Sequence, residues 1–306
     1  MAIDMGSVLT QMGILVFIMA LGFFCTKIHV TGPAFTRSAS SVVLNVFLVF
    51  TIINSVVSAD LEMSAANVGW DILVFFIMVF ICAAVGFVLM KLLNLKPDKR
   101  GLVFFCATFS NTVFVGFPVI ESVYGADGVF IATLSNIAFN GLVYTLGAMM
   151  VRGNKDGLNI KSALSAPVVA TIVSVAFFLT GIKLPEAVIK CTDIIGGATV
   201  PMSMLVVGSS LGSTSVRAAL SDWRVYLVSA VRLIICPLIC WLALRLFIHD
   251  ELLLGVCVIL ASCPTAMIAT MLAIAHDKNE AFASECVFVS TVFSAATMPL
   301  MIWLLL

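Results

Sequence analysis

The chain has 306 residues, of which 62% are hydrophobic and only 10% are charged, and its mean hydropathy is +1.19. Soluble domains are roughly 45–50% apolar, so this composition excludes a soluble globular protein and indicates a polytopic membrane protein. The formal net charge is zero, so the informative quantity is the position of the basic residues along the chain.

Ten apolar runs are each long enough to cross a bilayer core of about 30 Å, which takes roughly 20 helical residues. The first run has no basic residue before it and no small-residue cleavage site after it, so we interpret it as a spanning helix and not as a signal peptide. The sequence therefore predicts an all-α polytopic membrane protein with ten transmembrane helices. The runs comprise residues 8–26, 38–58, 68–92, 101–124, 128–151, 162–181, 187–211, 222–247, 252–275 and 281–306.

The basic residues are distributed unevenly between the two sides of these helices. Twelve of the sixteen lie in the connections after the odd-numbered runs, whereas three lie on the opposite side, at Lys183, Lys190 and Arg245. Because basic loops stay in the cytoplasm, we expect a cell-membrane protein with both termini outside the cytoplasm. Each half contains five helices and so enters the membrane from the opposite face, which predicts a 5+5 inverted repeat.

The fourth run of each half contains a proline beside small polar residues. Pro118 follows Gly116 in the stretch SNTVFVGFP, and Pro264 lies in ASCPTA. Backbone groups freed by a broken helix are tolerated inside a membrane only where protein or a water-filled cavity satisfies them. Interrupted helices at corresponding positions of two halves are typical of the substrate site of a secondary transporter. The polar candidates for this site are Ser110, Asn111, Thr112, Ser262 and Thr265.

We expect the interrupted helices to resume near Pro118 and near Pro264. Each restart would direct free N–H groups and the positive end of a helix dipole toward the middle of the membrane. Two converging helix N-termini predict a site for an anion. A proline considered alone is better explained as a simple helix kink, and it is the matching depth of the two breaks that favours a binding site.

The stretches around both breaks resemble the auxin efflux carrier family. SNTVFVGFPVIESVYGADG followed by NGLVYTLGAMM is similar to that family's helices 4 and 5, and the chain from GIKLPEAVIK to SAATMP is similar to helices 6 to 10. The family includes plant auxin transporters and bacterial members assigned to malonate and similar organic acids. The resemblance implies a single transporter of bile-acid-transporter type, with helices 4 and 9 crossing. Its implied parts are a dimer-forming scaffold of residues 8–58 and 162–211 and an elevator-like transport unit of residues 68–151 and 222–306.

The resemblance also implies roles for individual residues of the predicted site. Asn111 matches an asparagine that holds the substrate carboxylate, and Pro118 and Pro264 match the prolines of the crossing helices. Asn140 falls where plant members place a substrate-facing glutamine. Helix 2 lacks the proline that is usual in the family, so the match is incomplete.

Five positions bear on charge coupling within the membrane. Asp71 matches a supporting or coupling acid of the family, but the lysine that plant members place one turn later is Phe75 here. Arg232 lies deep in the eighth run, where it is either a counter-charge for the substrate or a structural partner of a carboxylate or of carbonyls freed by a break. Glu121 and Glu285 could titrate or hold a cation, or could lie at the wet rim of the membrane.

We therefore expect a secondary active or facilitative transporter of small organic anions, such as auxin-like or dicarboxylic acids. We expect a homodimer in the lipid bilayer, with no cofactor, no metal site and no nucleic-acid partner. The sequence leaves open the substrate, the direction of flux and proton coupling.

Three alternatives were weighed against this function. A sodium-coupled symporter of bile-acid type is disfavoured because residues 252–275 contain no acid. A channel or sensor would show repeated rings of polar residues lining a pore. An enzyme is disfavoured because GSSLG at 208–212 fits a hydrolase pattern without the histidine base and the strand-turn-helix that it needs, and because the chain lacks HExxH.

Overall fold

The structure is a computed structural model of the chain, and it describes residues 5–58, 64–153, 166–180, 185–213 and 222–306. All regular elements in these ranges are helical, and the described residues form no strand. Four of the basic residues used to predict the orientation lie outside the described ranges, namely Lys155, Lys161, Lys183 and Arg217.

The elements follow the predicted apolar runs, and several runs are divided into two or three pieces by π-helical turns, which are labelled η. In chain order the elements are α1 (Met5–Lys27), α2 (Pro33–Val42), η1 (Val43–Phe47), α3 (Leu48–Ser58), α4 (Ala65–Leu93), α5 (Pro97–Thr108), η2 (Thr112–Gly116), α6 (Phe117–Leu142), η3 (Val143–Gly147), α7 (Ala148–Arg152), α9 (Ala166–Thr180), α10 (Glu186–Gly197), α11 (Thr199–Ser213), α13 (Trp223–Ala230), η4 (Val231–Ile235), α14 (Cys236–Leu244), α15 (Glu251–Ser262), α16 (Ile268–Ala275) and α17 (Glu280–Leu305).

Six helical stretches in the described ranges are long and apolar enough to cross a membrane, and three further apolar helices are shorter. This architecture is that of an all-helical, polytopic membrane protein. The count of ten spans and the inverted repeat stay predictions. The six longer stretches are Pro33–Ser55, Ala66–Leu93, Thr112–Arg152, Glu186–Ser213, Trp223–Leu244 and Glu280–Leu305, and the shorter helices are Gly13–Lys27, Ala166–Thr180 and Glu251–Ser262.

The stretch Thr112–Arg152 is too long for a single crossing. Its 41 residues would span about 60 Å as a straight helix, roughly twice the thickness of the hydrocarbon core. The chain turns inside α6 at Gly125, which has φ 62° and ψ −151°, a conformation open to glycine because it has no Cβ. Gly125 thus divides α6 into two helical parts, in agreement with the predicted boundary between the runs 101–124 and 128–151.

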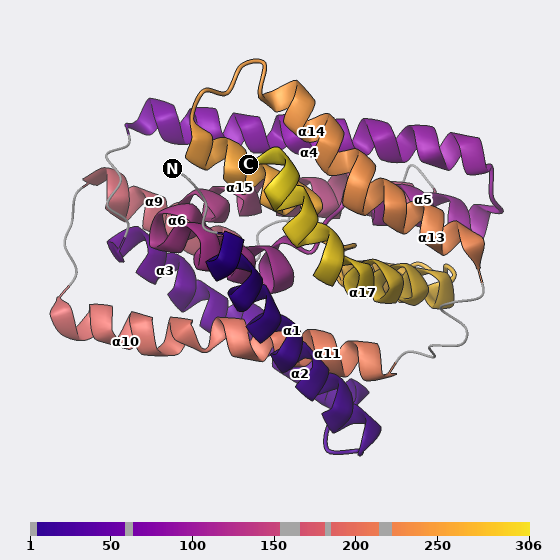
Figure 1. The fold of residues 1–306 in the computed structure, drawn as a ribbon, viewed down its shortest axis with the longest axis horizontal. Helices are drawn as coiled ribbons and strands as arrows, with labels where there is room; N and C mark the ends of the chain where they lie inside the picture. Colours follow the sequence, from indigo (N-terminus) through magenta and orange to yellow (C-terminus); the bar gives the residue numbers. More distant parts are fainter. Residues whose placement is uncertain (1–4, 59–63, 154–165, 181–184, 214–221) are drawn as a thin grey trace.

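The helices pack in two groups, which contact each other chiefly through α6 against α3 and α9. In the first group α1 packs along α11, α2 packs on α11, and α3 packs against α9 and α10. In the second group α4 packs on α5, α6 and α14, while α17 packs on α13, α15 and α16. Figure 1 shows α10 and α11 along one edge of the molecule and α4 along the opposite edge, with α5 and α15 between them.

The contact between α1 and α11 depends on small residues. A Cβ added at Gly208 would overlap the backbone carbonyl of Met19, so the two helix backbones approach closely, as small residues permit in membrane proteins. The hydroxyls of Thr26 and Ser209 are hydrogen-bonded across this contact at 2.8 Å. The GSSLG stretch is therefore part of a helix-packing surface in α11, in agreement with its interpretation as a chance match to a hydrolase motif.

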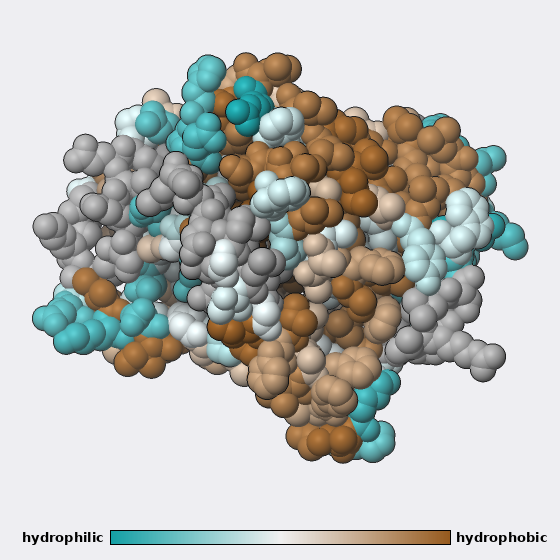
Figure 2. Space-filling view, in the orientation of Figure 1, coloured by the Kyte–Doolittle hydropathy of each residue, from teal (hydrophilic) through white to brown (hydrophobic). Residues whose placement is uncertain are grey.

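The outer surface is largely apolar. Figure 2 shows hydrophobic residues over α14 and the adjoining part of α4, and around the neighbouring ends of α1 and α2. Such a surface suits contact with lipid tails and not with water. Large hydrophobic side chains that are exposed on the described helices include Phe17, Leu92, Ile194 and Leu246.

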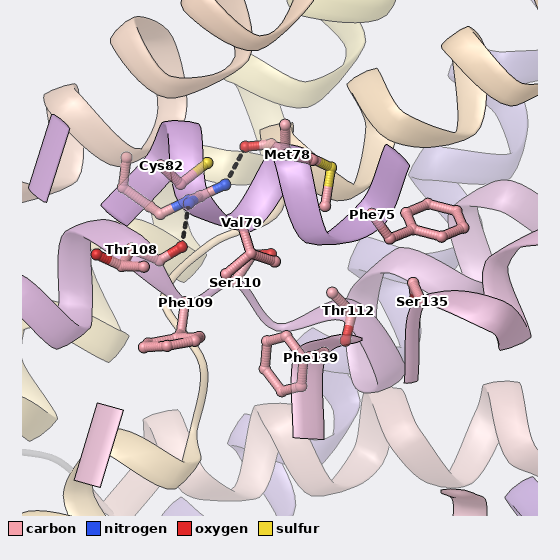
Figure 3. Close-up of a pocket in the computed structure, with 12 residues that line it drawn as sticks. Phe75, Met78, Val79, Cys82, Thr108, Phe109, Ser110, Thr112, Ser135 and Phe139 are labelled. Carbon is pink, nitrogen blue, oxygen red and sulfur yellow. Dashed lines mark hydrogen bonds between the residues drawn. The ribbon is translucent and has the colours of Figure 1, made fainter. Parts of the chain in front are cut away.

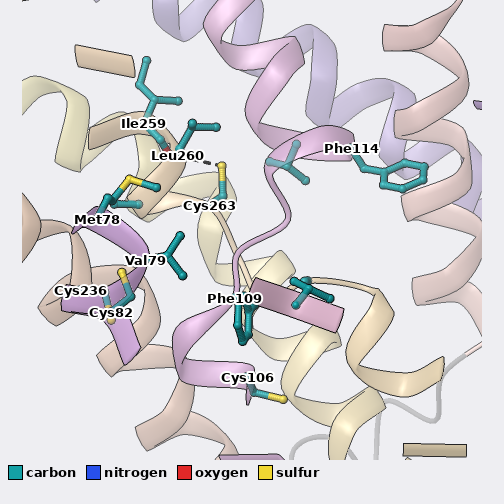
Figure 4. Close-up of a cluster of buried hydrophobic side chains, with 14 of the residues drawn as sticks. Met78, Val79, Cys82, Cys106, Phe109, Phe114, Cys236, Ile259, Leu260 and Cys263 are labelled. Carbon is teal, nitrogen blue, oxygen red and sulfur yellow. Dashed lines mark hydrogen bonds between the residues drawn. The ribbon is translucent and has the colours of Figure 1, made fainter. Parts of the chain in front are cut away.

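The core lies around the ends of α5 and α15. Figure 4 shows a cluster of buried side chains there, contributed by α4, α5, α14, α15 and η2. Several of its members are cysteines without a disulfide bond, including Cys82, Cys106, Cys236 and Cys263. Small polarizable side chains of this kind fill the space where helices converge.

Candidate functional site

The two interrupted helices meet each other inside the protein. After α5 and after α15 the backbone becomes extended, and an isolated antiparallel bridge pairs Ser110 with Thr265. Both residues are buried. The pairing satisfies backbone groups that would otherwise be unpaired at the middle of the membrane. The bridge consists of hydrogen bonds from Asn111 N–H to Pro264 O at 2.7 Å and from Ala266 N–H to Phe109 O at 2.9 Å.

Thr265 connects this bridge to two further helices. Its hydroxyl donates to the Cys106 carbonyl of α5 at 2.9 Å, and its N–H donates to the Ser290 hydroxyl of α17 at 3.1 Å. The hydroxyl of Ser262 donates to the Val258 carbonyl of its own helix at 2.7 Å. The hydroxyl groups of Thr265 and Ser262 therefore donate to backbone carbonyls and not to a ligand. The bonds of these two residues hold the backbone at the second break.

Asn111 caps the helix that follows the first break. Its side-chain oxygen accepts from Phe114 N–H at 3.3 Å, and its carbonyl accepts from Val115 and Gly116 N–H at 3.3 and 3.2 Å. The side-chain amide nitrogen is buried and has no hydrogen-bond partner among the described residues, and neither has the hydroxyl of Thr112. Since unpaired buried polar groups are destabilising, these two groups are candidate ligand contacts.

The prediction that the first helix resumes near Pro118 is wrong. The helix resumes at Thr112 with the π turn Thr112–Gly116 and runs through Pro118 as α6. A proline ring clashes with the carbonyl four residues earlier, here that of Phe114, and a wider π turn makes room for the ring. The break therefore lies at 109–111, before the proline and not at it.

Gly116 lies where the first interrupted helix touches the second. A Cβ added there would approach Leu260 Cδ2 at 2.9 Å and Cys263 Sγ at 3.1 Å. The absence of a side chain therefore lets η2 pack directly against the end of α15. Pro264 lies within the extended segment itself, and α16 begins four residues after it, at Ile268.

A small cavity lies beside the crossing point (Figure 3). Of the predicted site residues, Ser110, Thr112 and Arg232 line it. Most of the remaining lining is apolar or aromatic and comes from α4 and α6, which gives the cavity a mixed polar and apolar character. The other lining residues are Phe75, Met78, Val79, Cys82, Thr108, Phe109, Ser135, Phe139 and Ala261.

Asn140 does not line this cavity, and its predicted contact with the substrate stays a prediction. Asn140 is half-buried, and its amide donates to the Asn136 carbonyl of its own helix at 3.0 Å, while the neighbouring Phe139 lines the cavity. Asn136 is fully buried, and neither atom of its amide group has a hydrogen-bond partner in the described part of the chain. Asn136, Ser135 and Phe139 are not among the residues predicted for the site, although two adjacent polar residues inside an apolar run are a usable signal.

Arg232 is fully buried in η4. Of the two roles predicted for it, its hydrogen bonds match that of a structural partner of carbonyls freed by a break. Within the described ranges its guanidinium donates to backbone carbonyls and forms no salt bridge. The acceptors are the carbonyls of Ala107, Thr108, Ala261 and Cys263.

Comparison with known proteins identifies the family of the chain. The family described as membrane transport protein matches residues 7–302. The chain belongs to this family, the auxin efflux carriers. An uncharacterized transporter of Methanothermobacter thermautotrophicus is 29% identical over 309 residues, covering 97% of this chain and 98% of the relative. An uncharacterized transporter of Methanocaldococcus jannaschii is 25% identical over 244 residues, covering 75% of this chain and 78% of the relative.

The acids expected to couple transport in this auxin efflux carrier lie apart from one another. Asp71 is buried near the start of α4, and one of its carboxylate oxygens has no hydrogen-bond partner among the described residues. Glu121 is exposed, and Glu285 is half-buried in the second turn of α17. Of the three, only Asp71 lies on the helix that also supplies Phe75, Met78 and Val79 to the cavity.

Proposed function

We propose that this membrane transporter is a secondary carrier of small organic anions, and that the substrate carboxylate binds at the crossing of the two interrupted helices. The observation that carries the proposal is the bridged crossover, which leaves the amide nitrogen of Asn111 and the hydroxyl of Thr112 buried and without a hydrogen-bond partner among the described residues. Both groups are hydrogen-bond donors, and a carboxylate is an acceptor at every lone pair.

The helix dipoles favour the same kind of ligand. The half-helix that begins at Thr112 and the half-helix that begins at Ile268 each start beside the bridge. Helix N-termini carry a partial positive charge and free N–H groups, which stabilise a bound anion. In the described conformation the cavity has room for about one water molecule, so an organic acid would enter it in a more open state, where Phe75, Phe109 and Phe139 would contact its carbon skeleton.

The arrangement of helices supports a ten-span inverted repeat. With α6 divided at Gly125, the described elements fall into ten successive stretches that follow the ten predicted runs. The two interrupted helices are fourth and ninth in this order. Their broken segments pair antiparallel at Ser110 and Thr265, which is the direction expected of helices related by an inverted repeat.

We further propose an elevator mechanism, in which one packing group moves against the other. The group formed by α1, α2, α3, α9, α10 and α11 corresponds to the scaffold, through which two copies would form a homodimer. The remaining helices carry the whole crossover and correspond to the transport unit. In the first group α11 packs on η2, and α1, α3 and α9 pack on α6, so the transport unit would slide along these contacts as it moves.

Sodium coupling is not part of the proposal. Residues 252–275 contain no acid, and the carbonyls of Ala261 and Cys263 next to the second break accept hydrogen bonds from Arg232. A sodium site needs several free oxygen ligands. Transport is therefore expected to proceed without sodium.

The test begins with a thermal-shift screen of carboxylates on the purified protein, because a ligand at 100 times its dissociation constant stabilises by about 2.7 kcal/mol. An identified acid is then measured for uptake into proteoliposomes, with sodium or potassium as the cation at fixed pH and voltage. We expect saturable uptake that changes only a few-fold between the two cations. Loss of uptake in potassium would indicate a symporter, and unitary currents in a planar bilayer would indicate a channel.

A further inference from the structure

A helix that ends inside the membrane must find partners for its last four carbonyl groups. In α5 the first two of these carbonyls have partners close by. The Phe105 carbonyl accepts from Phe109 N–H at 2.9 Å, and the Cys106 carbonyl accepts from the Thr265 hydroxyl at 2.9 Å. The last two, those of Ala107 and Thr108, both accept from Nη1 of Arg232, at 3.2 and 2.9 Å.

The same guanidinium also reaches the end of α15. Its Nε donates to the Cys263 carbonyl at 3.2 Å, and its Nη2 donates to the Ala261 carbonyl. One side chain therefore bridges the ends of two helices that are distant in the sequence. Both ends are C-terminal and carry a partial negative charge, which a cation stabilises.

Only arginine has the geometry for this contact. Its planar guanidinium offers five N–H donors in a fixed fork, and Arg232 directs them at four carbonyls on two sides. A lysine would supply the charge from a single point and could not reach both helix ends at once. The cost of burying the cation is offset because its donors are paired with carbonyls at two helix ends, of which the Ala107 carbonyl also accepts from the Cys236 thiol at 3.5 Å.

We propose that Arg232 is the positioning residue of the crossover. It fixes the ends of α5 and α15 relative to each other, and so determines the place of the Ser110–Thr265 bridge and of the Asn111 side chain that follows it. The clamp itself follows from the hydrogen bonds above, whereas its importance for anion binding rests on the proposed function.

The test compares Arg232→Lys and Arg232→Gln with the wild type by hydrogen–deuterium exchange of the purified protein. The amides to follow are those of Asn111 and Ala266, which form the bridge. Arg245→Gln is the matched control, because Arg245 is exposed at the end of α14, where its guanidinium lies over the Trp241 ring. Exchange in α1 and α11 reports on the rest of the fold, and malonate binding by calorimetry reports on the site.

We expect exchange at the two bridge amides to accelerate about tenfold or more in both Arg232 variants, since hydrogen bonds to a charged group stabilise local structure by at least that factor. Exchange in α1 and α11, and throughout the control, should stay at the wild-type rate. Wild-type protection of the bridge in the lysine variant would refute the proposal, because the charge alone would then suffice. Equal loss of protection in α1 and α11 would also refute it, by showing a general role in stability.

The exchange result does not depend on the ligand. If the wild type binds neither malonate nor any other acid but the bridge loses protection as expected, the proposed function fails while the positioning role stands. If acids bind and the bridge keeps its protection in both variants, the positioning role fails alone.

Discussion

Asn111→Asp separates the two contributions that the structure assigns to this side chain. The side-chain oxygen caps the following helix through Phe114 N–H at 3.3 Å, while the amide nitrogen is buried with no partner in the described ranges. Aspartate keeps an oxygen that can cap the helix and replaces the free donor by an acceptor. Alanine removes the cap and the donor together. Neither change affects the backbone bond from Asn111 N–H to Pro264.

The expected magnitudes differ between binding and stability. Loss of one donor to a charged ligand costs about 1.5–3 kcal/mol, so Asn111→Ala should raise the dissociation constant roughly ten- to a hundredfold. Asn111→Asp also places a negative charge against the substrate carboxylate at low dielectric, and should weaken binding at least as much. Both variants should also unfold more easily than the wild type, because alanine loses a cap worth about 0.5–2 kcal/mol and aspartate buries a carboxylate without a cationic partner.

Calorimetry with the acid found in the screen measures the dissociation constants, and thermal unfolding measures the stabilities. The control is Asn45→Asp, since Asn45 is exposed and its amide donates to the Ser41 carbonyl of its own helical segment at 2.8 Å. Binding by the aspartate variant should recover at low pH, where the new acid is neutral. Two folded Asn111 variants that bind the acid with wild-type affinity would show that the site is elsewhere.

Three further predictions follow from the structure. Asn136→Leu should raise the unfolding temperature, since an unpaired buried amide costs about 1–3 kcal/mol. It should also lower the affinity for the acid. A stabilised variant with normal uptake would exclude Asn136 from the site. Gly208→Ala should reduce the yield of monodisperse protein in size-exclusion chromatography, because the added methyl overlaps the Met19 carbonyl, whereas Gly13→Ala, with nothing within 4 Å of the added atom, should not. Lys96→Cys should resist an impermeant thiol reagent in intact cells, because the basic loop that contains Lys96 is expected in the cytoplasm and both termini outside. Labelling from outside would show that the orientation is the reverse of the predicted one.

The first break shows where local sequence rules are insufficient. Gly116 and Pro118 are the residues that weaken a helix, yet the helix continues through both of them. The chain is instead extended at 109–111, where no helix-breaking residue occurs. That conformation is stabilised by Pro264 and Ala266, which lie more than a hundred residues away in the sequence, and no local pattern reports such a partner.

The sequence by itself determined the class of protein, the approximate limits of the helices and the two stretches that contain the breaks. These follow from hydrophobicity and from proline chemistry, which are properties of short segments. Only the tertiary structure decided that the two breaks pair with each other, that carbonyls satisfy Arg232, and that Phe139 lines the cavity. One residue along a helix rotates a side chain by about 100°, and polar groups inside a membrane find their partners on segments distant in the chain. None of these outcomes can therefore be read from the spacing of residues alone.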